Sequence, residues 1–193
     1  IPIENSLAGR VADIHYLIPK YKLQIHAEHF QRVTHNLLGV KGSQLKNIKT
    51  VRSHSQAIGQ CRKVILQNNL KAIISADTAG SAKFVAEKKD KSDSAIASEL
   101  AAKIYNLEIL KSNIEDEPGN VTRFFIMGKD SHHPEVENKK YITSCIFKLK
   151  SIPAALYKAL GGFATNGVNL CKLESFSVKN TFDQVNFYID IEG

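Results

Sequence analysis

The chain has 193 residues, 43% of them hydrophobic, and a formal net charge of +7. This length and apolar content supply enough core for one or two domains, and no apolar run reaches the roughly 18 residues that a membrane-spanning helix needs. The lysines are spread singly or in pairs beside acidic residues, without a basic stripe that carries aromatics. The charge is therefore weak evidence for nucleic-acid binding, and it equally suits a protein whose ligand is a small dianion.

The cysteines and histidines indicate neither a disulfide framework nor a metal site. Cys61, Cys145 and Cys171 are odd in number and show no CxxC or Cys/His spacing, which is typical of a reduced cytoplasmic protein. No charged and then apolar leader opens the chain, so secretion is not expected. The histidine pairs nearest to metal-ligand spacing, at 26/29 and 132/133, lack a second cluster, so no metal site is predicted.

Between residues 33 and 127, short apolar runs rich in β-branched residues alternate with segments of helical periodicity. Strands are predicted at 33–40, 50–54, 71–75, 94–98 and 124–127. Helices are predicted at 56–67, from the capping pair Asp77-Thr78 through Ala86, and around Leu100, Ala101 and Ile104. This alternation with short connections predicts an α/β unit whose sheet is covered on both faces.

A polar, charged segment with a proline, at 129–140, breaks this pattern and is predicted to be an interdomain linker. The predicted elements that follow it are a strand at 141–150, a helix at 153–165, a turn at 166–168, and strands at 168–178 and 183–191. This βαββ order makes up most of a small α+β domain, which a fourth strand and its covering helix would complete.

Polar clusters stand where predicted strands give way to helices or loops, the position at which open α/β sheets hold ligands. They are Glu4-Asn5-Ser6, Ser53-His54-Ser55-Gln56 with Gln60 one helical turn on, Asp77-Thr78, and Ser98. Helix starts bind anions through free N–H groups, although N-capping alone accounts for any one of these clusters. Together they predict a polar cleft for a carboxylate ligand. Neither a P-loop nor a GxGxxG motif occurs, so a nucleotide site is not expected.

An acidic loop that contains Pro118-Gly119 leads into Thr122-Arg123, at the start of the apolar run Phe124–Met127. A guanidinium matches a carboxylate bidentately, and a hydroxyl beside it can assist a leaving oxygen. The alternative is an ordinary strand entry with a solvated or ion-paired Arg123, because adjacent strand residues face opposite ways. The polar clusters upstream favour the ligand-binding interpretation.

Five segments resemble, in order and spacing, the successive motifs of the prephenate dehydratase family. They are PIENSLAG at 2–9, the segment from Ser53-His54 to Gln60-Cys61, ADTAGSA at 76–82, AIAS at 95–98 and NVTRF at 120–124. Beyond the linker, the sequence at 152–175 is similar to the ACT regulatory domain that follows the catalytic domain in that family. The resemblance covers essentially the whole chain.

The resemblance implies that residues 1–128 form a bilobal α/β catalytic domain like type 2 periplasmic binding proteins, with prephenate between the lobes. Residues 129–140 are then the linker, and 141–193 form a ferredoxin-like ACT domain. Relative to the family pattern, the chain begins at the hinge strand that carries PIENS and stops before the last helix and strand of the ACT domain. We therefore expect an incomplete first lobe and an incomplete ACT domain. If the first lobe is missing from the molecule, the 193-residue piece is expected to be inactive or nearly so.

The reaction that the resemblance implies is the loss of carbon dioxide and the ring hydroxyl from prephenate, which leaves phenylpyruvate in phenylalanine biosynthesis. Aromatisation drives this step, so no cofactor is expected; the protein has to hold two carboxylates and help hydroxide leave. Thr122 is expected to assist the departing hydroxyl through a hydrogen bond or a proton relay, because a threonine hydroxyl is a poor acid. The other expected catalytic residues are Asn5, Gln60 and Ser53, and the expected substrate-binding residues are Arg123, Ser6, Asp77, Thr78 and Ser98.

Phenylalanine is the expected allosteric inhibitor. The resemblance implies a site at Ala154, Ala155, Leu156, Asn169, Leu170, Glu174 and Ser175. Family members often carry GAL and ESRP motifs there, whereas this chain has Ala154 in place of the glycine and Phe176-Ser177 in place of Arg-Pro. The strength of inhibition and its ligand therefore stay open. Exposed strand edges and helices of an ACT domain predict a homodimer or homotetramer.

Two other functions stay open from the sequence. An arogenate dehydratase runs the same elimination on an amino-acid analogue, and a non-catalytic amino-acid-binding regulator uses the same modules. Thr122 with Asn5 and Gln60 favours an enzyme, because a pure sensor has no need of that hydroxyl. Nucleic acid as a partner rests on the net charge alone and is not expected, and neither is a membrane.

Overall fold

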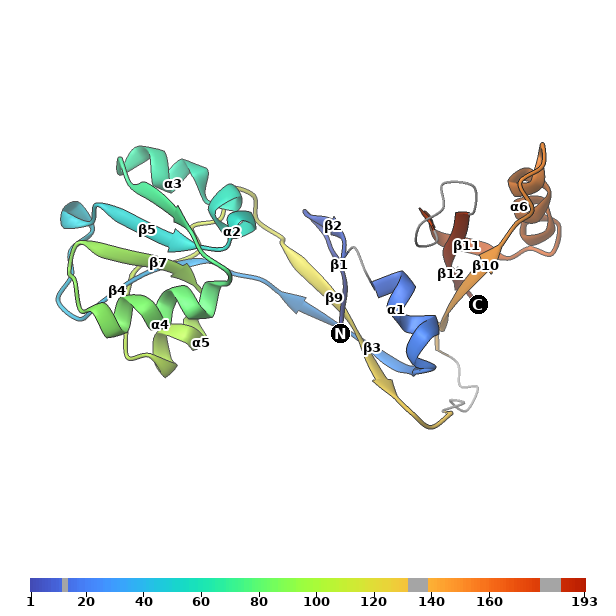
Figure 1. The fold of residues 1–193 in the computed structure, drawn as a ribbon, viewed down its shortest axis with the longest axis horizontal. Coiled ribbons are helices and arrows are strands. Elements are labelled where there is room, and N and C mark those ends of the chain that lie inside the picture. The colour runs from blue at the N-terminus through green and yellow to red at the C-terminus, as the bar shows by residue number, and fades with distance from the viewer. Residues whose placement is uncertain (12–13, 132–138, 178–184) are drawn as a thin grey trace. The chain divides into compact units, whose positions relative to one another are not determined.

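The computed structural model describes residues 1–11, 14–131, 139–177 and 185–193, and they fall into two compact units (Figure 1). Unit 1 comprises Ile1–Arg10 and Glu28–Phe125, and unit 2 comprises Val11–Ala27 and Ile126–Gly193. Part of the predicted linker, 132–138, lies outside the described residues, as do His132 and His133. No helix in the described part of the chain is long and apolar enough to cross a membrane.

The larger sheet of unit 1 has five strands in the order β6-β5-β7-β4-β8. Strand β5 runs parallel to β6 and to β7, and β4 runs antiparallel to β7 and to β8. The strands are β4 (Asn36–Gly39), β5 (Thr50–Ser53), β6 (Lys71–Ile74), β7 (Asp93–Ala97) and β8 (Glu108–Lys111). The helices are η1 (Leu45–Asn47), α2 (Ser55–Gln60), α3 (Arg62–Gln67), α4 (Thr78–Lys88) and α5 (Glu99–Ile104).

Both faces of this sheet are covered, as the strand–helix alternation predicted. Leu37 and Leu38 are neighbours in β4, so their side chains point to opposite faces, and both are fully buried. Leu37 joins an apolar cluster with residues of α2 and α3, and Leu38 joins another with residues of α4 and α5. Figure 1 shows the two pairs of helices on opposite sides of the sheet.

The predicted single helix at 56–67 is wrong at Cys61, where the backbone leaves the helical region and separates α2 from α3. The reason is Asp116, which lies 54 residues beyond Arg62 in the acidic loop that contains Pro118-Gly119. The Asp116 carboxylate accepts the backbone N–H groups of Arg62 and Lys63, at 2.9 and 3.0 Å. These are donors that a new helix start leaves without a partner inside the helix.

A second sheet has the order β2-β1-β9-β3. Its strands are β1 (Pro2–Asn5), β2 (Gly9–Arg10), β3 (Gln24–Arg32) and β9 (Val121–Gly128). Strand β1 runs antiparallel to β9 and pairs Asn5 with Thr122. The sequence did not predict β3, because six of its nine residues are polar and the apolar ones do not alternate with them along the whole strand; all except Ile25 are exposed.

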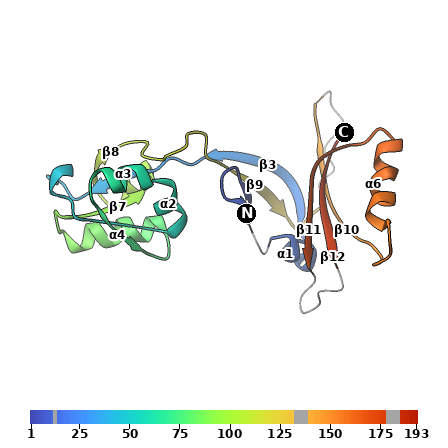
Figure 2. The same cartoon turned by 90° about the horizontal axis from the view of Figure 1, so that it is seen from above.

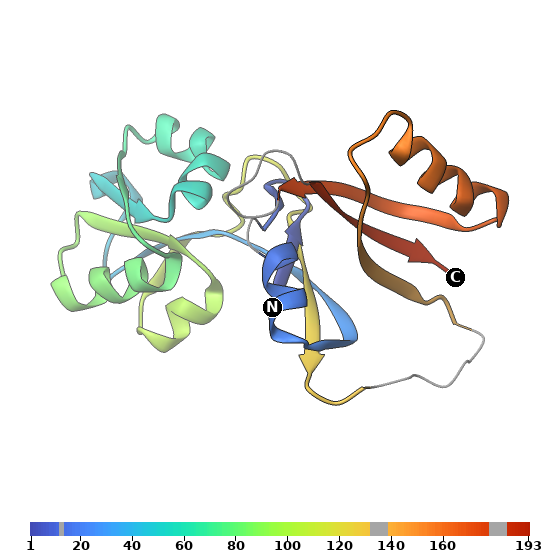
Figure 3. The ribbon, with the colours of Figure 1, turned by 45° about the vertical axis from the view of Figure 1, so that its right-hand side comes forward.

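Unit 2 contains the predicted βαββ order in β10 (Ile142–Lys148), α6 (Ala155–Thr165), β11 (Asn169–Ser177) and β12 (Val185–Glu192). The sheet is antiparallel, with β12 in the middle (Figure 3). The ring of Phe147 lies 5.4 Å from Phe187 and 6.4 Å from Phe163, so aromatic contacts join α6 to the sheet. Helix α1 (Ile14–Tyr21) lies on the other side of the sheet from α6 (Figure 2). The sequence did not predict α1, which contains Pro19.

A buried carboxylate at the start of β7 generates a test of the fold. Asp93 accepts hydrogen bonds from Lys88 Nζ and from the Thr50 hydroxyl. Burial opposes ionisation of Asp93, but these two bonds hold its pKa below the ordinary value. The Asp93→Asn variant should lower the free energy of unfolding at pH 7 by about 1–3 kcal/mol, measured by urea denaturation.

The difference between wild type and Asp93→Asn should depend on pH. Because the folded pKa is depressed, the wild-type advantage is fully present above the unfolded pKa, about 4, and disappears as the pH falls through the lower folded value. An exposed carboxylate on α4, Glu87, provides the control, and Glu87→Gln should leave stability unchanged. An advantage that persists undiminished well below pH 3 would contradict this account.

Candidate functional site

The pairing of β1 with β9 brings two of the expected catalytic side chains into contact. Asn5 stands opposite Thr122 in the ladder, and its Nδ2 donates to Thr122 Oγ1 at 3.0 Å. The other end of the Asn5 amide closes the turn that follows β1: its Oδ1 accepts the backbone N–H groups of Leu7 and Ala8, at 3.1 and 2.8 Å. One side chain therefore fixes both the turn and the threonine hydroxyl.

Two buried residues extend this contact into the interior of unit 1. Asn120, which is 2% exposed, accepts from Asn5 Nδ2 at 2.5 Å and donates from its own Nδ2 to Gln60 Oε1 at 2.9 Å. His35, which is 6% exposed, places Nε2 2.9 Å from the same Gln60 oxygen. Asn5, Thr122, Asn120, Gln60 and His35 form one hydrogen-bonded set, which we call the amide chain.

Sequence reasoning named Asn5, Gln60 and Thr122 in this set and missed His35 and Asn120. A signal existed for both. His35 is a polar residue inside the apolar run at 33–40, and Asn120 is the first residue of NVTRF. Neither residue lies where a predicted strand gives way to a helix or loop, which is the position of the predicted polar clusters.

Ser6 and Ser53 are occupied with the backbone. Ser6 Oγ accepts the N–H of Val121 at 2.9 Å and lies 3.3 Å from the carbonyl of Gly119, so it holds the loop that leads to Thr122. Ser53 is fully buried, and its hydroxyl donates to the carbonyl of Ile96 at 2.7 Å, which joins β5 to β7. Both serines position main chain around the site.

Arg123 has a carboxylate partner within the protein. Its Nε lies 2.7 Å from Glu28 Oε2, its guanidinium lies 5.0 Å from the ring centre of Phe125, and its side chain is 13% exposed. As the neighbour of Thr122 in a strand, it points to the opposite face of the sheet. This is the ion-paired arrangement that the sequence left open as the alternative to substrate binding.

The remaining residues of unit 1 that were expected to bind substrate lie at helix starts. Asp77 Oδ1 accepts the N–H of Gly80 at 2.6 Å, which confirms the predicted cap of α4, and Thr78 is the first residue of that helix. Ser98 Oγ accepts the N–H of Ala101 at 3.2 Å and caps α5. Asp77 and Ser98 are exposed, so both caps remain open to solvent.

The residues expected to bind phenylalanine are divided among three places in unit 2. Ala154 precedes α6 in the left-handed conformation, with φ 63°, and Ala155 and Leu156 begin the helix. Asn169 and Leu170 begin β11, and Asn169 donates to Glu192 Oε2 at 2.8 Å. Neighbours in β11, Glu174 and Ser175 point to opposite faces of the sheet. Glu174 contacts Lys172 Nζ at 3.1 Å and His15 Nε2 at 3.6 Å.

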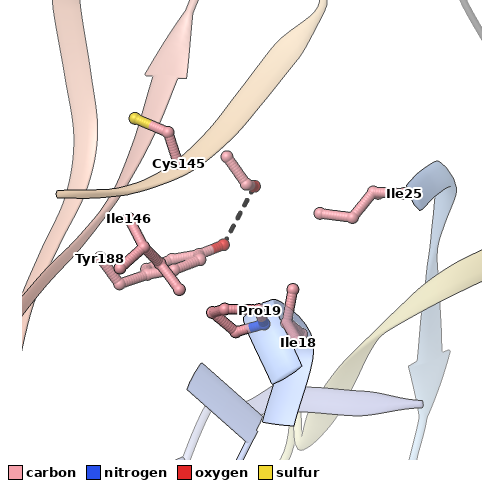
Figure 4. A pocket seen from close by; sticks show the side chains of 7 residues that line it. Ile18, Pro19, Ile25, Cys145, Ile146 and Tyr188 are labelled. Carbon is pink, nitrogen blue, oxygen red and sulfur yellow. Dashed lines mark hydrogen bonds between the residues drawn. The ribbon is translucent and has the colours of Figure 1, made fainter. Parts of the chain in front are cut away.

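A small pocket of about 170 Å³ lies in unit 2 between α1 and the sheet (Figure 4). Its lining is mainly apolar, with Ser144 and Tyr188 as the polar members. The Tyr188 hydroxyl donates to Ser144 Oγ at 3.0 Å. None of the residues expected from the sequence to bind substrate or phenylalanine lines this pocket.

The described residues include no group of three or more His, Cys, Asp or Glu side chains close enough to hold a metal ion. The nearest titratable neighbour of Gln60 in sequence is Cys61, which is fully buried. Burial, together with the negative charges of Asp116 and Glu115, raises the pKa of the Cys61 thiol to about 12. Cys61 is therefore a thiol at neutral pH and a packing residue.

Alkylation of the native protein tests this assignment. A maleimide at pH 8 should modify the exposed Cys171 quickly and Cys61 at least about 100-fold more slowly, because the thiolate is the reactive form. Peptide mass spectrometry at several times measures both rates, and denaturation in urea should make them equal. Equal rates in the native protein would show that the α2–α3 junction is open to solvent.

Comparison with known proteins identifies what the chain resembles. The family model described as prephenate dehydratase matches residues 1–132. A bifunctional N-acyl-homoserine lactone acylase/prephenate dehydratase of Komagataeibacter europaeus is 45% identical, over 98% of this chain and 68% of that protein. The chloroplastic arogenate dehydratase/prephenate dehydratase 1 of Arabidopsis thaliana is 40% identical, over 91% of this chain and 44% of that protein.

A solved structure agrees with these relatives. The prephenate dehydratase of Arthrobacter aurescens in complex with L-Phe superposes with a TM-score of 0.89 at 31% identity, over 100% of this chain and 64% of that one. The predicted fold class, an α/β arrangement shared with prephenate dehydratase, is thereby confirmed. The chain spans between 44% and 68% of the lengths of these three proteins.

Proposed function

Because the chain belongs to the prephenate dehydratase family, we propose that the protein that carries it converts prephenate to phenylpyruvate, carbon dioxide and hydroxide. The observation that carries the proposal is the Thr122 hydroxyl, held 3.0 Å from Asn5 Nδ2. The bond from the ring to the carboxylate carbon breaks and its electron pair enters the ring, while the ring C–O bond breaks and hydroxide departs. The ring becomes aromatic, so the step needs positioned hydrogen-bond donors rather than a strong acid.

The proposed roles follow the contacts of the amide chain. Thr122 donates a hydrogen bond to the departing oxygen, and Asn5 orients Thr122. Gln60, half-exposed beside them, is proposed to bind a substrate oxygen. Arg123 is a weaker candidate for the substrate carboxylate than the sequence suggested, because Glu28 already neutralises it at 2.7 Å.

Replacement of Thr122 tests the catalytic proposal. In the full-length protein, Thr122→Ala should lower kcat for phenylpyruvate formation from prephenate by roughly 100- to 1,000-fold, because it removes the donor to the leaving oxygen. Thr122→Ser, which retains a hydroxyl, is the matched control and should stay within about tenfold of wild type. Formation of phenylpyruvate is followed by its absorbance.

Each outcome of that assay has a distinct meaning. Turnover by Thr122→Ala at the wild-type rate would remove Thr122 from the mechanism and leave the enzyme proposal standing. If the wild type itself fails to act on prephenate, the dehydratase proposal is wrong, and a non-catalytic amino-acid-binding regulator becomes the better description.

The alternative substrate is arogenate, which one of the relatives carries in its name. The same preparation should therefore be offered prephenate and arogenate, and the ratio of the two kcat/KM values assigns the preference. Another relative carries N-acyl-homoserine lactone acylase in its name, so release of homoserine lactone from an N-acyl-homoserine lactone is a third assay on the same protein.

We further propose that residues 1–128 belong to the catalytic domain, 129–140 to a linker and 141–193 to an ACT domain, in a cytoplasmic homodimer or homotetramer. Phenylalanine is the proposed inhibitor. Support comes from the βαββ order of unit 2 and from the L-Phe complex of the structural relative. The proposed ligand-binding residues are those at the start of α6 and along β11.

Ala154 provides a test of phenylalanine binding. Its left-handed conformation costs an alanine about 1–2 kcal/mol, and a glycine nothing, so Ala154→Gly should stabilise the fold and open space for the ligand backbone. The dissociation constant for L-phenylalanine, measured by calorimetry, should fall. Ala155→Gly, at the first residue of the helix, is the control and should not tighten binding, because Ala155 does not have a left-handed conformation. No heat of binding in either protein would mean that phenylalanine is not the ligand.

A further inference from the structure

We propose that His35 and Asn120 are positioning residues that fix the amide of Gln60 with its Nε2 group toward the substrate, and that the same bonds leave the Thr122 hydroxyl proton available. The inference rests on the proposed function, because the substrate in question is the one assigned there. It assigns a direction to every hydrogen bond of the amide chain.

The turn after β1 fixes the orientation of the Asn5 amide, and with it the direction of the first hydrogen bonds in the amide chain. Backbone N–H groups only donate, so the atom of the Asn5 side chain that meets Leu7 and Ala8 is the oxygen. The Asn5 nitrogen must then be the atom that faces Thr122 and Asn120. A side-chain amide nitrogen cannot accept, so Thr122 Oγ1 is the acceptor in that contact. In the described part of the chain, the Thr122 hydroxyl proton is used in no other hydrogen bond, which leaves it for a ligand.

Asn120 fixes the orientation of the Gln60 amide in the same way. Because Asn120 Oδ1 accepts from Asn5, its nitrogen is the atom that faces Gln60, at 2.9 Å. Gln60 must therefore present its oxygen to Asn120, and its nitrogen points elsewhere. Among the described residues, Gln60 Nε2 meets no acceptor, and the side chain is half-exposed. Two donors, Gln60 Nε2–H and Thr122 O–H, are thus left for an oxygen-rich anion.

His35 completes the orientation of Gln60. Its Nε2 lies 2.9 Å from Gln60 Oε1, an oxygen already shown to be an acceptor, so the proton of His35 is on Nε2. The opposite tautomer would place two lone pairs against each other. The histidine is 6% exposed, and its backbone is held by Ile114 and by Glu115, whose Oε2 accepts the His35 N–H at 3.1 Å. It has little freedom to turn away.

Substitution of Gln60 separates its role as a hydrogen-bond donor to the substrate from its structural role. Gln60→Glu keeps an oxygen acceptor for His35 and Asn120 but removes both N–H donors and adds a negative charge beside an anionic substrate. It should lower kcat/KM for prephenate by about 100-fold while the melting temperature stays at or above that of wild type. Wild-type kcat/KM in Gln60→Glu would overturn the proposal, since a purely structural Gln60 tolerates that change.

Substitution of His35 tests the positioning role. His35→Leu, in the full-length protein, should lower kcat/KM by on the order of tenfold, and His35→Gln, which restores an N–H donor, should recover most of that loss. In a Gln60→Ala background, His35→Leu should have no further effect on kcat/KM, because it acts through Gln60 alone. The control is His29→Leu, at an exposed histidine of β3, which should behave as wild type. Additive losses in the double variant, or no rescue by His35→Gln, would refute positioning.

A measurement without substrate distinguishes failure of this inference from failure of the proposed function. In protein labelled with ¹⁵N-histidine, the two ring nitrogens of the neutral tautomers have different chemical shifts. The His35 signal, assigned by its loss in His35→Leu, should be that of the Nε2–H form. A neutral Nδ1–H signal would overturn the inference whatever the enzyme does. Conversely, an Nε2–H signal in a protein that leaves prephenate unchanged would support the proposed orientation of Gln60 and contradict the proposed reaction.

Discussion

The side chain of Asn5 is bonded at both ends, and the geometry of the site depends on it. Its oxygen closes the turn after β1 through Leu7 and Ala8, and its nitrogen reaches across the sheet to Thr122 and Asn120. No other residue type has an acceptor and a two-proton donor at this spacing on so short a side chain. An aspartate at position 5 would still accept the N–H groups of the turn but could not donate to Thr122. A serine at this position would not make either set of hydrogen bonds in the same way.

The apolar clusters of unit 1 fix the position of the amide chain. Leu37 and Leu38 are buried on opposite faces of β4, which fixes the strand between the two helical layers. His35 comes directly before that strand, so its ring has little choice of position. The next residue, Asn36, accepts the N–H of Asn113 at 3.2 Å and ties the start of the acidic loop to the same strand. Hydrophobic packing thus fixes the position of β4, and the hydrogen bonds of His35 and Asn36 form at the end of this fixed strand.

Much of the fold could be predicted from local patterns, and the failures have physical causes. Alternation of apolar runs located β5, β6 and β7, and the cap at Asp77 located α4, because each signal lies within a few residues of its effect. The break at Cys61 depends on Asp116, which is 54 residues from Arg62, and no local pattern carries that information. For the site, the polar clusters and the family motifs indicated Asn5, Gln60 and Thr122. They left out His35 and Asn120: a polar residue in an apolar run and the first residue of NVTRF are visible in the sequence, but their partner Gln60 is 25 and 60 residues away.

The interruption between α2 and α3 also changes what the main chain of Gln60 can do. In an uninterrupted helix its carbonyl would accept the N–H of Val64, four residues on. Here it accepts the N–H of Asp116 instead, at 2.6 Å. A continuous helix and an anchored acidic loop therefore compete for the same oxygen atom. A sequence that formed a more stable continuous helix at 56–67 would hold the acidic loop before Thr122 less firmly. Weak helix formation at the junction of α2 and α3 is therefore needed to anchor this loop.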